Sequence, residues 1–154
     1  RYKRQALEFA RAEPEDTKAL RRLARASEAH WGYDEAFMEN FDAGFNVTED
    51  FIRCNPVYAA GDRGCPTAFW GIRQDRDAWE LEYFYVAEER LGRGLGKQMW
   101  EHMTGWCEKK EICRIHFVTS PQAVGFYRKM GAVRDGETRS PVDGRPVPHF
   151  VYDV

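Results

Sequence analysis

The stretch from Tyr83 to Trp100, YFYVAEERLGRGLGKQMW, constrains the fold more than any other part of the sequence. It passes from aromatic and β-branched residues, typical of a strand, to three closely spaced glycines and then to an amphipathic segment. In that segment apolar residues recur at helical spacing, at Leu95, Met99, Met103 and Trp106. The stretch therefore predicts a strand, a tight glycine turn and a helix, a unit found in α/β domains with a parallel crossover.

The other hydrophobic patterns place this unit inside one domain of mixed α/β architecture. Runs of strand-forming residues predict strands over residues 4–12, 56–60, 66–73, 78–86, 111–119, 132–137 and 146–154. Apolar spacing predicts further helices over residues 13–31, 33–41, 48–53 and 120–131. Because no linker or repeat interrupts the chain, residues 1–154 are expected to form a single domain. Its sheet should be mixed, with an antiparallel meander, then a parallel crossover, and helices on both faces.

Local signals support two of the expected helices. Pro14 stands at a first helical position, and acidic residues follow it in the first turn, where negative charge suits the helix dipole. Thr48 is a candidate N-cap for the helix over 48–53. The first long helix should bury an apolar stripe made of Leu20, Leu23, Ala24 and Trp31.

Composition narrows the class of protein. With 43% hydrophobic and 31% charged residues the chain is typical of a globular domain, and its net charge of −2 gives no electrostatic case for nucleic acid or an anionic membrane as a partner. No apolar run approaches the ~20 residues of a membrane span, and the first residues lack the apolar region of a signal peptide. Cysteines and histidines lack metal-ligand spacing, so we expect reduced thiols, no metal and a cytoplasmic location.

The glycine turn fits two nucleotide-binding patterns poorly. A P-loop has four residues between its first glycine and its Gly-Lys pair, then Ser or Thr, whereas three residues separate Gly92 from Gly96 and Gln98 follows the lysine. The spacing also differs from the G-x-G-x-x-G of dinucleotide folds. The N–H groups at the start of the next helix remain as a phosphate site, to which Arg93 and Lys97 add positive charge. The alternative is a tight turn that serves only the fold.

Two carboxylates lie on the strand before the turn. Period-2 alternation predicts one face with Trp79, Leu81, Tyr83 and Tyr85 and another with Glu80, Glu82, Phe84 and Val86. Partial burial would raise the pKa of Glu80 or Glu82 toward that of a useful general base. The alternative is that one or both carboxylates face solvent or pair with an arginine.

A second feature follows the next strand, in the short helix SPQAVGFYRKMGA from Ser120 to Ala132. Ligands of open α/β sheets bind at the carboxyl ends of strands, and both the glycine turn and this helix begin at such ends. Tyr127 is therefore expected to point toward whatever lies on the glycine turn, with a tyrosine of the core as the alternative.

Together these two segments resemble the signatures of the GNAT superfamily of N-acetyltransferases, and within it small bacterial proteins of unassigned substrate. The first signature, Gln or Arg, two residues, Gly, one residue, then Gly or Ala, falls on LGRGLG from Leu91 to Gly96. The second, N-x-x-A-x-x-F-Y-x-x-x-G-F, falls on Ser120 to Ala132. Leu91 replaces the usual Gln or Arg, which removes one side-chain contact to phosphate, and Ser120 replaces Asn. The strand order is similar too, so the resemblance extends over essentially the whole chain.

The resemblance implies acetyl-CoA as co-substrate and a splayed parallel pair formed by strands 78–86 and 111–119. The pantetheine arm would lie in the opening, the pyrophosphate would meet the glycine turn, and two aromatic side chains of the second signature would flank the thiol. The implied cofactor-binding residues are Phe84, Tyr85, Val86, Leu91, Gly92, Arg93, Gly94, Leu95, Gly96, Lys97, Ser120, Phe126 and Tyr127.

The implied reaction is direct transfer of the acetyl group, in a ternary complex, to a primary amine of a small molecule or peptide. Glu82 is expected to act as base, directly or through a water, with Glu80 as second choice and Tyr127 as the acid that protonates the CoA thiolate. Candidate acceptor-binding residues near the end of the first helix are His30, Trp31 and Tyr33. The alternative there is a core role for the tryptophan and an exposed histidine.

Other interpretations stay open at this point. A non-catalytic GNAT-like module would bind acyl-CoA as a sensor or structural unit and would lack a working base and acid. An enzyme with a different pocket would transfer a succinyl or longer acyl group. A homodimer is also open, because an exposed tail strand over 146–154 could pair across two copies.

Overall fold

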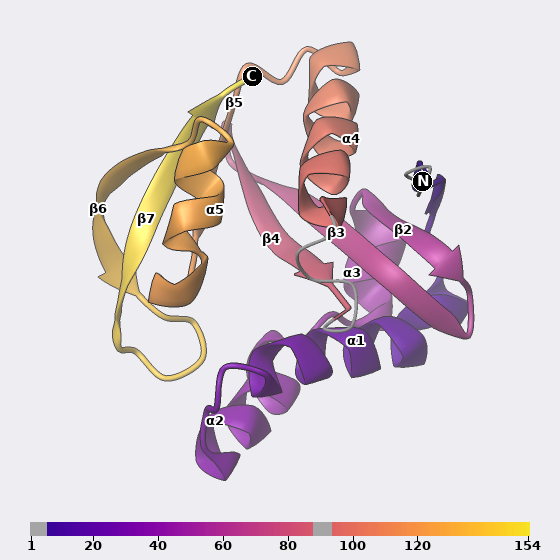
Figure 1. The fold of residues 1–154 in the computed structure, drawn as a ribbon, viewed down its shortest axis with the longest axis vertical. Coiled ribbons are helices and arrows are strands. Elements are labelled where there is room, and N and C mark those ends of the chain that lie inside the picture. Colours follow the sequence, from indigo (N-terminus) through magenta and orange to yellow (C-terminus); the bar gives the residue numbers. More distant parts are fainter. Residues whose placement is uncertain (1–5, 88–93) are drawn as a thin grey trace, which may run out of the picture.

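The computed structural model describes residues 6–87 and 94–154, which form one seven-stranded mixed sheet with helices on both faces (Figure 1). The strand order is β1-β2-β3-β4-β5-β7-β6, and all neighbouring pairs are antiparallel except β4 and β5. The strands are β1 (Phe9–Arg11), β2 (Val57–Asp62), β3 (Cys65–Asp75), β4 (Ala78–Val86), β5 (Arg114–Val118), β6 (Val133–Arg139) and β7 (Pro146–Asp153). This arrangement confirms the predicted mixed α/β fold with a meander followed by a parallel crossover.

The N-terminal helices cover one face of the sheet. They are the 3-10 turn η1 (Pro14–Asp16), α1 (Thr17–Ala29), α2 (Glu35–Asn40), the π-helical turn η2 (Phe41–Phe45) and α3 (Glu49–Cys54). Leu20, Leu23 and Ala24 of α1 are buried against this face, as the apolar spacing predicted. The hydroxyl of Thr48 accepts a hydrogen bond from the N–H of Phe51 at 3.0 Å, which confirms the predicted N-cap of α3.

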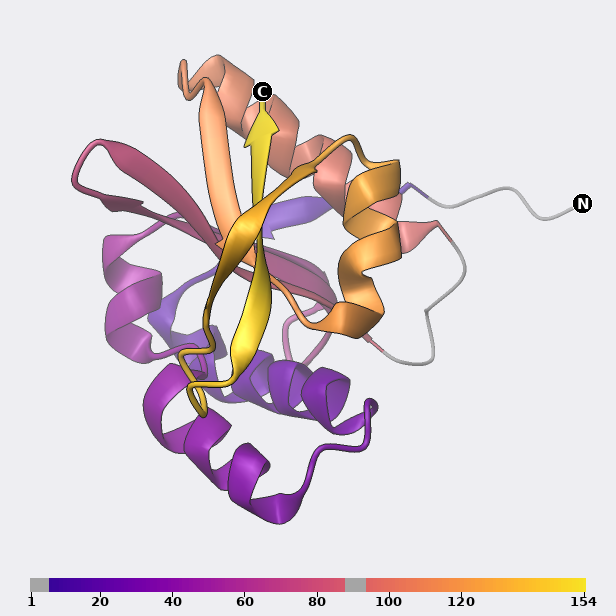
Figure 2. The same ribbon diagram turned by 90° about the vertical axis from the view of Figure 1, so that its left-hand side faces the viewer.

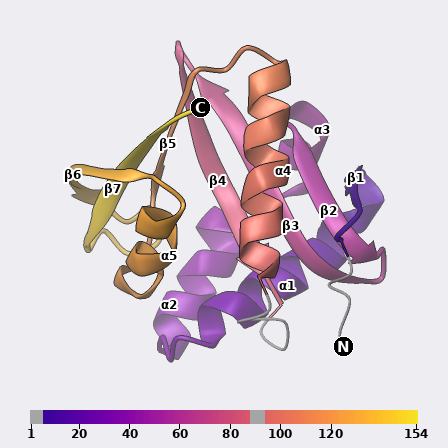
Figure 3. The same cartoon turned by 45° about the horizontal axis from the view of Figure 1, so that its top comes forward.

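The other face is covered by α4 (Leu95–Lys109) and by the short segment η4 (Pro121–Ala123) with α5 (Val124–Lys129). Figure 3 shows α4 lying across β3 and β4, while Figure 2 shows α5 beside the hairpin of β6 and β7. Met99 and Met103 of α4 are fully buried and pack with Trp70 of β3 and Phe117 of β5 in one core cluster. In the described part of the chain, no helix is long and apolar enough to cross a bilayer.

The parallel strands β4 and β5 diverge almost from their start (Figures 1 and 3). Their ladder contains a single register pair, Glu80 opposite His116, whereas β3 and β4 stay paired from Asp75 opposite Ala78 to Ala68 opposite Val86. The later residues of β4 therefore have a strand partner on one side only. This opening is the splay that the family resemblance implied.

A β-bulge in β4 corrects the predicted division of its side chains between two faces. The register shifts so that Tyr83 pairs with Gly71 and Leu81 pairs with Ile72, which leaves Glu82 as the extra residue. Leu81 consequently packs in the same core cluster as Phe84, on the α4 face, while Tyr83 packs in the cluster on the α1 face. The expectation that the carboxylates share a face with Phe84 and Val86 was wrong, because strict alternation stops at the bulge.

Two further expectations change in the structure. Trp31 does not extend the buried stripe of the first helix, because α1 ends at Ala29 and the Trp31 side chain is 42% exposed. The tail strand β7 is not an edge strand, since it lies between β5 and β6. The structure therefore removes the reason given for pairing of the tail across a dimer.

Candidate active site

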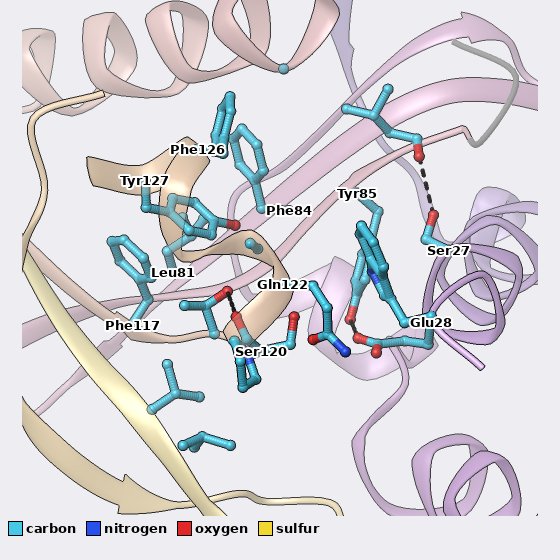
Figure 4. Close-up of a pocket in the computed structure, with 18 of the residues that line it drawn as sticks. Ser27, Glu28, Leu81, Phe84, Tyr85, Phe117, Ser120, Gln122, Phe126 and Tyr127 are labelled. Carbon is cyan, nitrogen blue, oxygen red and sulfur yellow. Dashed lines mark hydrogen bonds between the residues drawn. The ribbon is translucent and has the colours of Figure 1, made fainter. Parts of the chain in front are cut away.

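A cavity of about 750 Å³ lies where β4 and β5 diverge, between the helices of the two faces (Figure 4). It reaches from the start of α4 to the end of α1, and its volume is in the range of small-molecule sites. It is lined by most of the residues singled out from the sequence, namely His30, Trp31, Tyr33, Glu82, Phe84, Tyr85, Val86, Gly94, Leu95, Gly96, Lys97, Ser120, Phe126 and Tyr127. Glu80 is not among the lining residues, and Leu91, Gly92 and Arg93 lie outside the described residues.

The two sequence signatures meet at one end of this cavity. Gly94, at the N-cap of α4, has a φ of 75°, a left-handed conformation that glycine adopts without strain. A Cβ on Gly96 would lie 3.0 Å from Cε1 of Phe126, so the absence of a side chain lets the α5 ring pack against the helix start. Lys97 in the first turn of α4 also lines the cavity, as does Lys129 at the end of α5. A helix N-terminus with a lysine in its first turn suits a phosphate group.

Aromatic side chains form the middle of the cavity. Figure 4 shows Phe84, Phe117, Phe126 and Tyr127 gathered on one side. The ring centroids of Phe117 and Tyr127 are 4.6 Å apart, and those of Phe84 and Tyr127 are 5.9 Å apart. Burial raises the pKa of the Tyr127 phenol, and the nearby charge of Glu28 raises it further. The phenol therefore keeps its proton at neutral pH and lines the cavity as a hydrogen-bond donor.

One arginine holds both carboxylates of β4. Arg73 of β3 donates from Nε to Glu82 and from Nη2 to Glu80, the latter at 2.6 Å. Burial raises the pKa of Glu80, and the charge of Glu82 raises it while Arg73 opposes the shift. The structure thus realises the alternative in which the two carboxylates pair with an arginine, and only Glu82 also reaches the cavity.

Replacement of Arg73 by methionine is expected to lower the free energy of unfolding at pH 7 by about 1–3 kcal/mol, since two half-buried carboxylates lose their counter-ion. The pKa of Glu80 is already raised, and without the guanidinium the folded state raises it further above its unfolded value. A carboxyl group with a raised pKa destabilises the fold only when it is ionised. The loss of unfolding free energy in Arg73→Met should therefore be small near pH 4 and reach its full value at pH 7. Urea unfolding at both pH values checks this.

A matched control is Arg53→Met in α3, which breaks ion pairs to Glu49 and Asp50 that are largely exposed. Arg53→Met should lower the free energy of unfolding only slightly at either pH. An equal loss for Arg73→Met at pH 4 and pH 7 would show that the packing of the arginine stem, and not its charge, stabilises the strand pair.

The structure adds a partly buried carboxylate that the sequence analysis missed, Glu28 in the last turn of α1. Its Oε1 accepts a hydrogen bond of 2.8 Å from the hydroxyl of Tyr85, and burial raises its pKa (Figure 4). A signal was present in the sequence, because Glu28 follows Leu20 and Ala24 at four-residue spacing and so lies in line with the buried stripe of the helix, at its partly exposed end. A neighbouring bond from Ser27 Oγ to the carbonyl of Val86, at 3.2 Å, ties α1 to the end of β4.

An aromatic wall closes the cavity on the α2 side. The rings of Tyr33 and Phe37 stack with centroids 4.0 Å apart, and the guanidinium of Arg145 lies 5.4 Å and 5.3 Å from the two centroids. Arg145 is itself held by Asp143 at 2.6 Å. Phe45 and Gln122 also line this region, and neither was singled out from the sequence. Their contribution depends on contacts between distant segments, which local patterns do not encode.

Comparisons with known proteins agree with this geometry. Residues 17–132 match the model of the acetyltransferase (GNAT) family. A relative, the 5-NmdU N-acetyltransferase of Pseudomonas phage PaMx11, is 25% identical over 130 residues, covering 83% of this chain and 88% of the relative.

Solved structures show the same fold. The PaiA N-acetyltransferase of Thermoplasma acidophilum in complex with coenzyme A has a TM-score of 0.74 at 18% identity, and the match covers 97% of this chain and 100% of that chain. The ribosomal-protein-S18-alanine N-acetyltransferase of Escherichia coli has a TM-score of 0.71 at 16% identity, and the match covers 96% of this chain and 94% of that chain. The family match spans most of the chain, including both signatures. The chain belongs to the GNAT family of acetyltransferases, whose co-substrate is acetyl-CoA.

Proposed function

We propose that this protein transfers an acetyl group directly from acetyl-CoA to a primary amine of a small molecule or peptide, both bound in one ternary complex. One observation carries the proposal. A single cavity runs from the start of α4 at Gly94, through the opening between β4 and β5, to a polar region with the carboxylates of Glu28 and Glu82. Such a cavity can hold a thioester and an amine side by side without a covalent enzyme intermediate.

The residues at the glycine end fit coenzyme A. The helix start at Gly94 to Lys97 would bind the pyrophosphate through backbone N–H groups, where a Cβ at Gly96 would crowd the Phe126 ring. The side of β4 that faces the opening has no strand partner beyond Glu80, so its backbone groups are available to the amide groups of the pantetheine arm. Phe126 and Tyr127 would flank the thioester, with Phe84 of β4 beside them.

The chemistry requires two proton movements. As the C–N bond forms and the C–S bond breaks, the amine gives up one proton, and the leaving sulfur accepts a hydrogen bond and finally a proton. We assign the first step to Glu82, directly or through a water, with Glu80 behind it on the same guanidinium. We assign the second to Tyr127, whose buried phenol is protonated at neutral pH. A backbone N–H near Tyr85 would polarise the thioester carbonyl.

Release of free thiol from acetyl-CoA, followed with a thiol reagent, tests this function. The protein should release thiol only when a primary amine is present, and mass spectrometry should find the amine heavier by one acetyl group. The panel includes aryl-methylamines, alkylamines, polyamines, N-terminal peptides and 5-NmdU, the compound in the name of the phage relative. Calorimetric binding of acetyl-CoA without turnover of any amine in the panel would instead indicate a non-catalytic acyl-CoA-binding module.

A further inference from the structure

The carboxylate of Glu28 lies in the cavity without a basic partner. Its bonding partner is the neutral phenol of Tyr85, and among the described residues no lysine, arginine or histidine lies within ion-pair distance of it. This contrasts with Glu82, which Arg73 holds. The ionised form of a carboxylate that is partly removed from water is costly, as the raised pKa of Glu28 reflects, and a positively charged ligand at this place would stabilise that form.

The position of Glu28 is fixed by two elements. The bond from Tyr85 joins its carboxylate to β4, and the adjacent bond from Ser27 to Val86 holds the last turn of α1 against the same strand. The negative end of the α1 dipole adds to the preference for a cation at this place. Figure 4 shows the Glu28–Tyr85 pair across the cavity from Tyr127, and the charge of Glu28 contributes to the raised pKa of that phenol. A cation bound at Glu28 would thus lie near the centre of transfer.

The surroundings of this pair favour a flat ligand with one charge. The stacked rings of Tyr33 and Phe37 line the cavity as a flat pair, and the guanidinium of Arg145 lies over both of them. Phe45 adds a third ring to the lining. Aromatic groups gain from offset stacking on such a wall. A polycation would need several free carboxylates, and of the acidic residues described in the lining, Glu82 is already paired with Arg73.

We propose that Glu28 and Tyr85 form the subsite that binds the acceptor as its ammonium ion, and that the acceptor carries one primary amine on a flat, uncharged body. The inference rests on the proposed acetyl transfer and specifies its acceptor. Glu28 acts in binding and selection. The bound ammonium ion first loses one proton through Glu82 to solvent, and the neutral amine then attacks the thioester and loses a second proton to Glu82 as the C–N bond forms, while the CoA sulfur leaves with a proton from Tyr127. Loss of the Glu28 carboxylate should therefore raise KM for the amine far more than it lowers kcat.

Calorimetric titration of the full chain saturated with CoA tests the subsite, with benzylammonium chloride as the charged probe and benzyl alcohol as its neutral counterpart. Benzylammonium should bind at least about tenfold more tightly than benzyl alcohol, since it gains a charge-assisted hydrogen bond. Glu28→Gln should weaken the binding of benzylammonium by about 10- to 100-fold and remove the difference in affinity between the two probes. Glu39→Gln, an exposed change on α2, should leave both affinities as in the wild type.

A second variant and two further amines also test the subsite. Tyr85→Phe retains the ring and loses the hydrogen bond to Glu28, so it should weaken the binding of benzylammonium by a smaller factor than Glu28→Gln. This variant tests the subsite if Glu28→Gln does not fold. Propylammonium and spermidine test the flat body and the single charge, and both should bind more weakly than benzylammonium. Equal binding of the two benzyl probes, or tighter binding of spermidine, overturns the inference.

The kinetic outcome separates this inference from the proposed function. If an amine is acetylated and Glu28→Gln lowers its kcat with KM unchanged, the subsite is wrong while acetyl transfer stands. If the wild type binds neither acetyl-CoA nor CoA, the proposed function fails, and probe binding to the protein alone still decides whether Glu28 attracts ammonium ions.

Discussion

The double substitution Gly94→Glu, Gly96→Glu is expected to weaken acetyl-CoA binding by at least about 100-fold, because two carboxylates would stand where the pyrophosphate is to bind, and like charges in contact cost several kcal/mol. Gly94 also has a φ of 75°, so a side chain there strains the start of α4. At position 96 the new side chain would meet the ring of Phe126, whose Cε1 lies 3.0 Å from an added Cβ. Calorimetric titration with acetyl-CoA, beside the wild type, measures the effect.

The matched control for this experiment is Gly105→Glu, at the other end of the same helix. An added Cβ at Gly105 meets nothing within 4 Å, so a carboxylate added at this distance from the helix start should leave acetyl-CoA affinity as in the wild type. Lys97→Glu, at an exposed position of the helix start, provides a second test if the double variant does not fold. A folded double variant with wild-type affinity would mean that the glycines serve the turn and packing alone, and that coenzyme A binds elsewhere.

The sequence predicted the fold well where local patterns coincide with tertiary contacts. β4 occupies residues 78–86 as predicted, because its aromatic and β-branched residues suit a central strand that is covered on both faces. The N-cap at Thr48 and the buried stripe of α1 follow from short-range rules for the same reason. The bulge at Glu82 left no such trace, since it depends on how β3 pairs with β4, and a single inserted residue moves its neighbours to the other face.

The candidate site was predictable only in part. The glycine-rich segment and the aromatic segment each carry a signature in consecutive residues, and the structure places Gly96 of the first beside Phe126 of the second. The acceptor side is assembled from segments far apart in the chain, as when Arg145 covers the ring of Tyr33. No spacing rule joins such residues. Glu28 is an intermediate case, because a carboxylate in line with an apolar helical stripe is visible in the sequence as a partly buried charge that needs a partner.

Replacement of Tyr127 by phenylalanine is expected to lower kcat by about 10²- to 10³-fold, the usual contribution of a positioned acid or hydrogen-bond donor. The change removes one oxygen and keeps the ring, which packs against Phe117 at 4.6 Å and Phe126 at 5.2 Å, so the fold and acetyl-CoA affinity should be retained. Because burial raises the pKa of this phenol, it stays protonated at every working pH. The rate should therefore fall by a similar factor across the pH range.

The shape of the pH–rate profile distinguishes the roles in this site. An alkaline limb in the wild type cannot come from Tyr127 if its phenol never ionises in that range, so Tyr127→Phe should keep the limb and lower its height. Tyr152→Phe is the matched control, since Tyr152 packs on Trp100 and is not among the residues that line the cavity. A kcat within about twofold of the wild type for Tyr127→Phe would exclude the phenol as donor to the leaving sulfur. Loss of the alkaline limb in that variant would show that bound acetyl-CoA lowers the pKa of the phenol enough for it to give up its proton in the reaction.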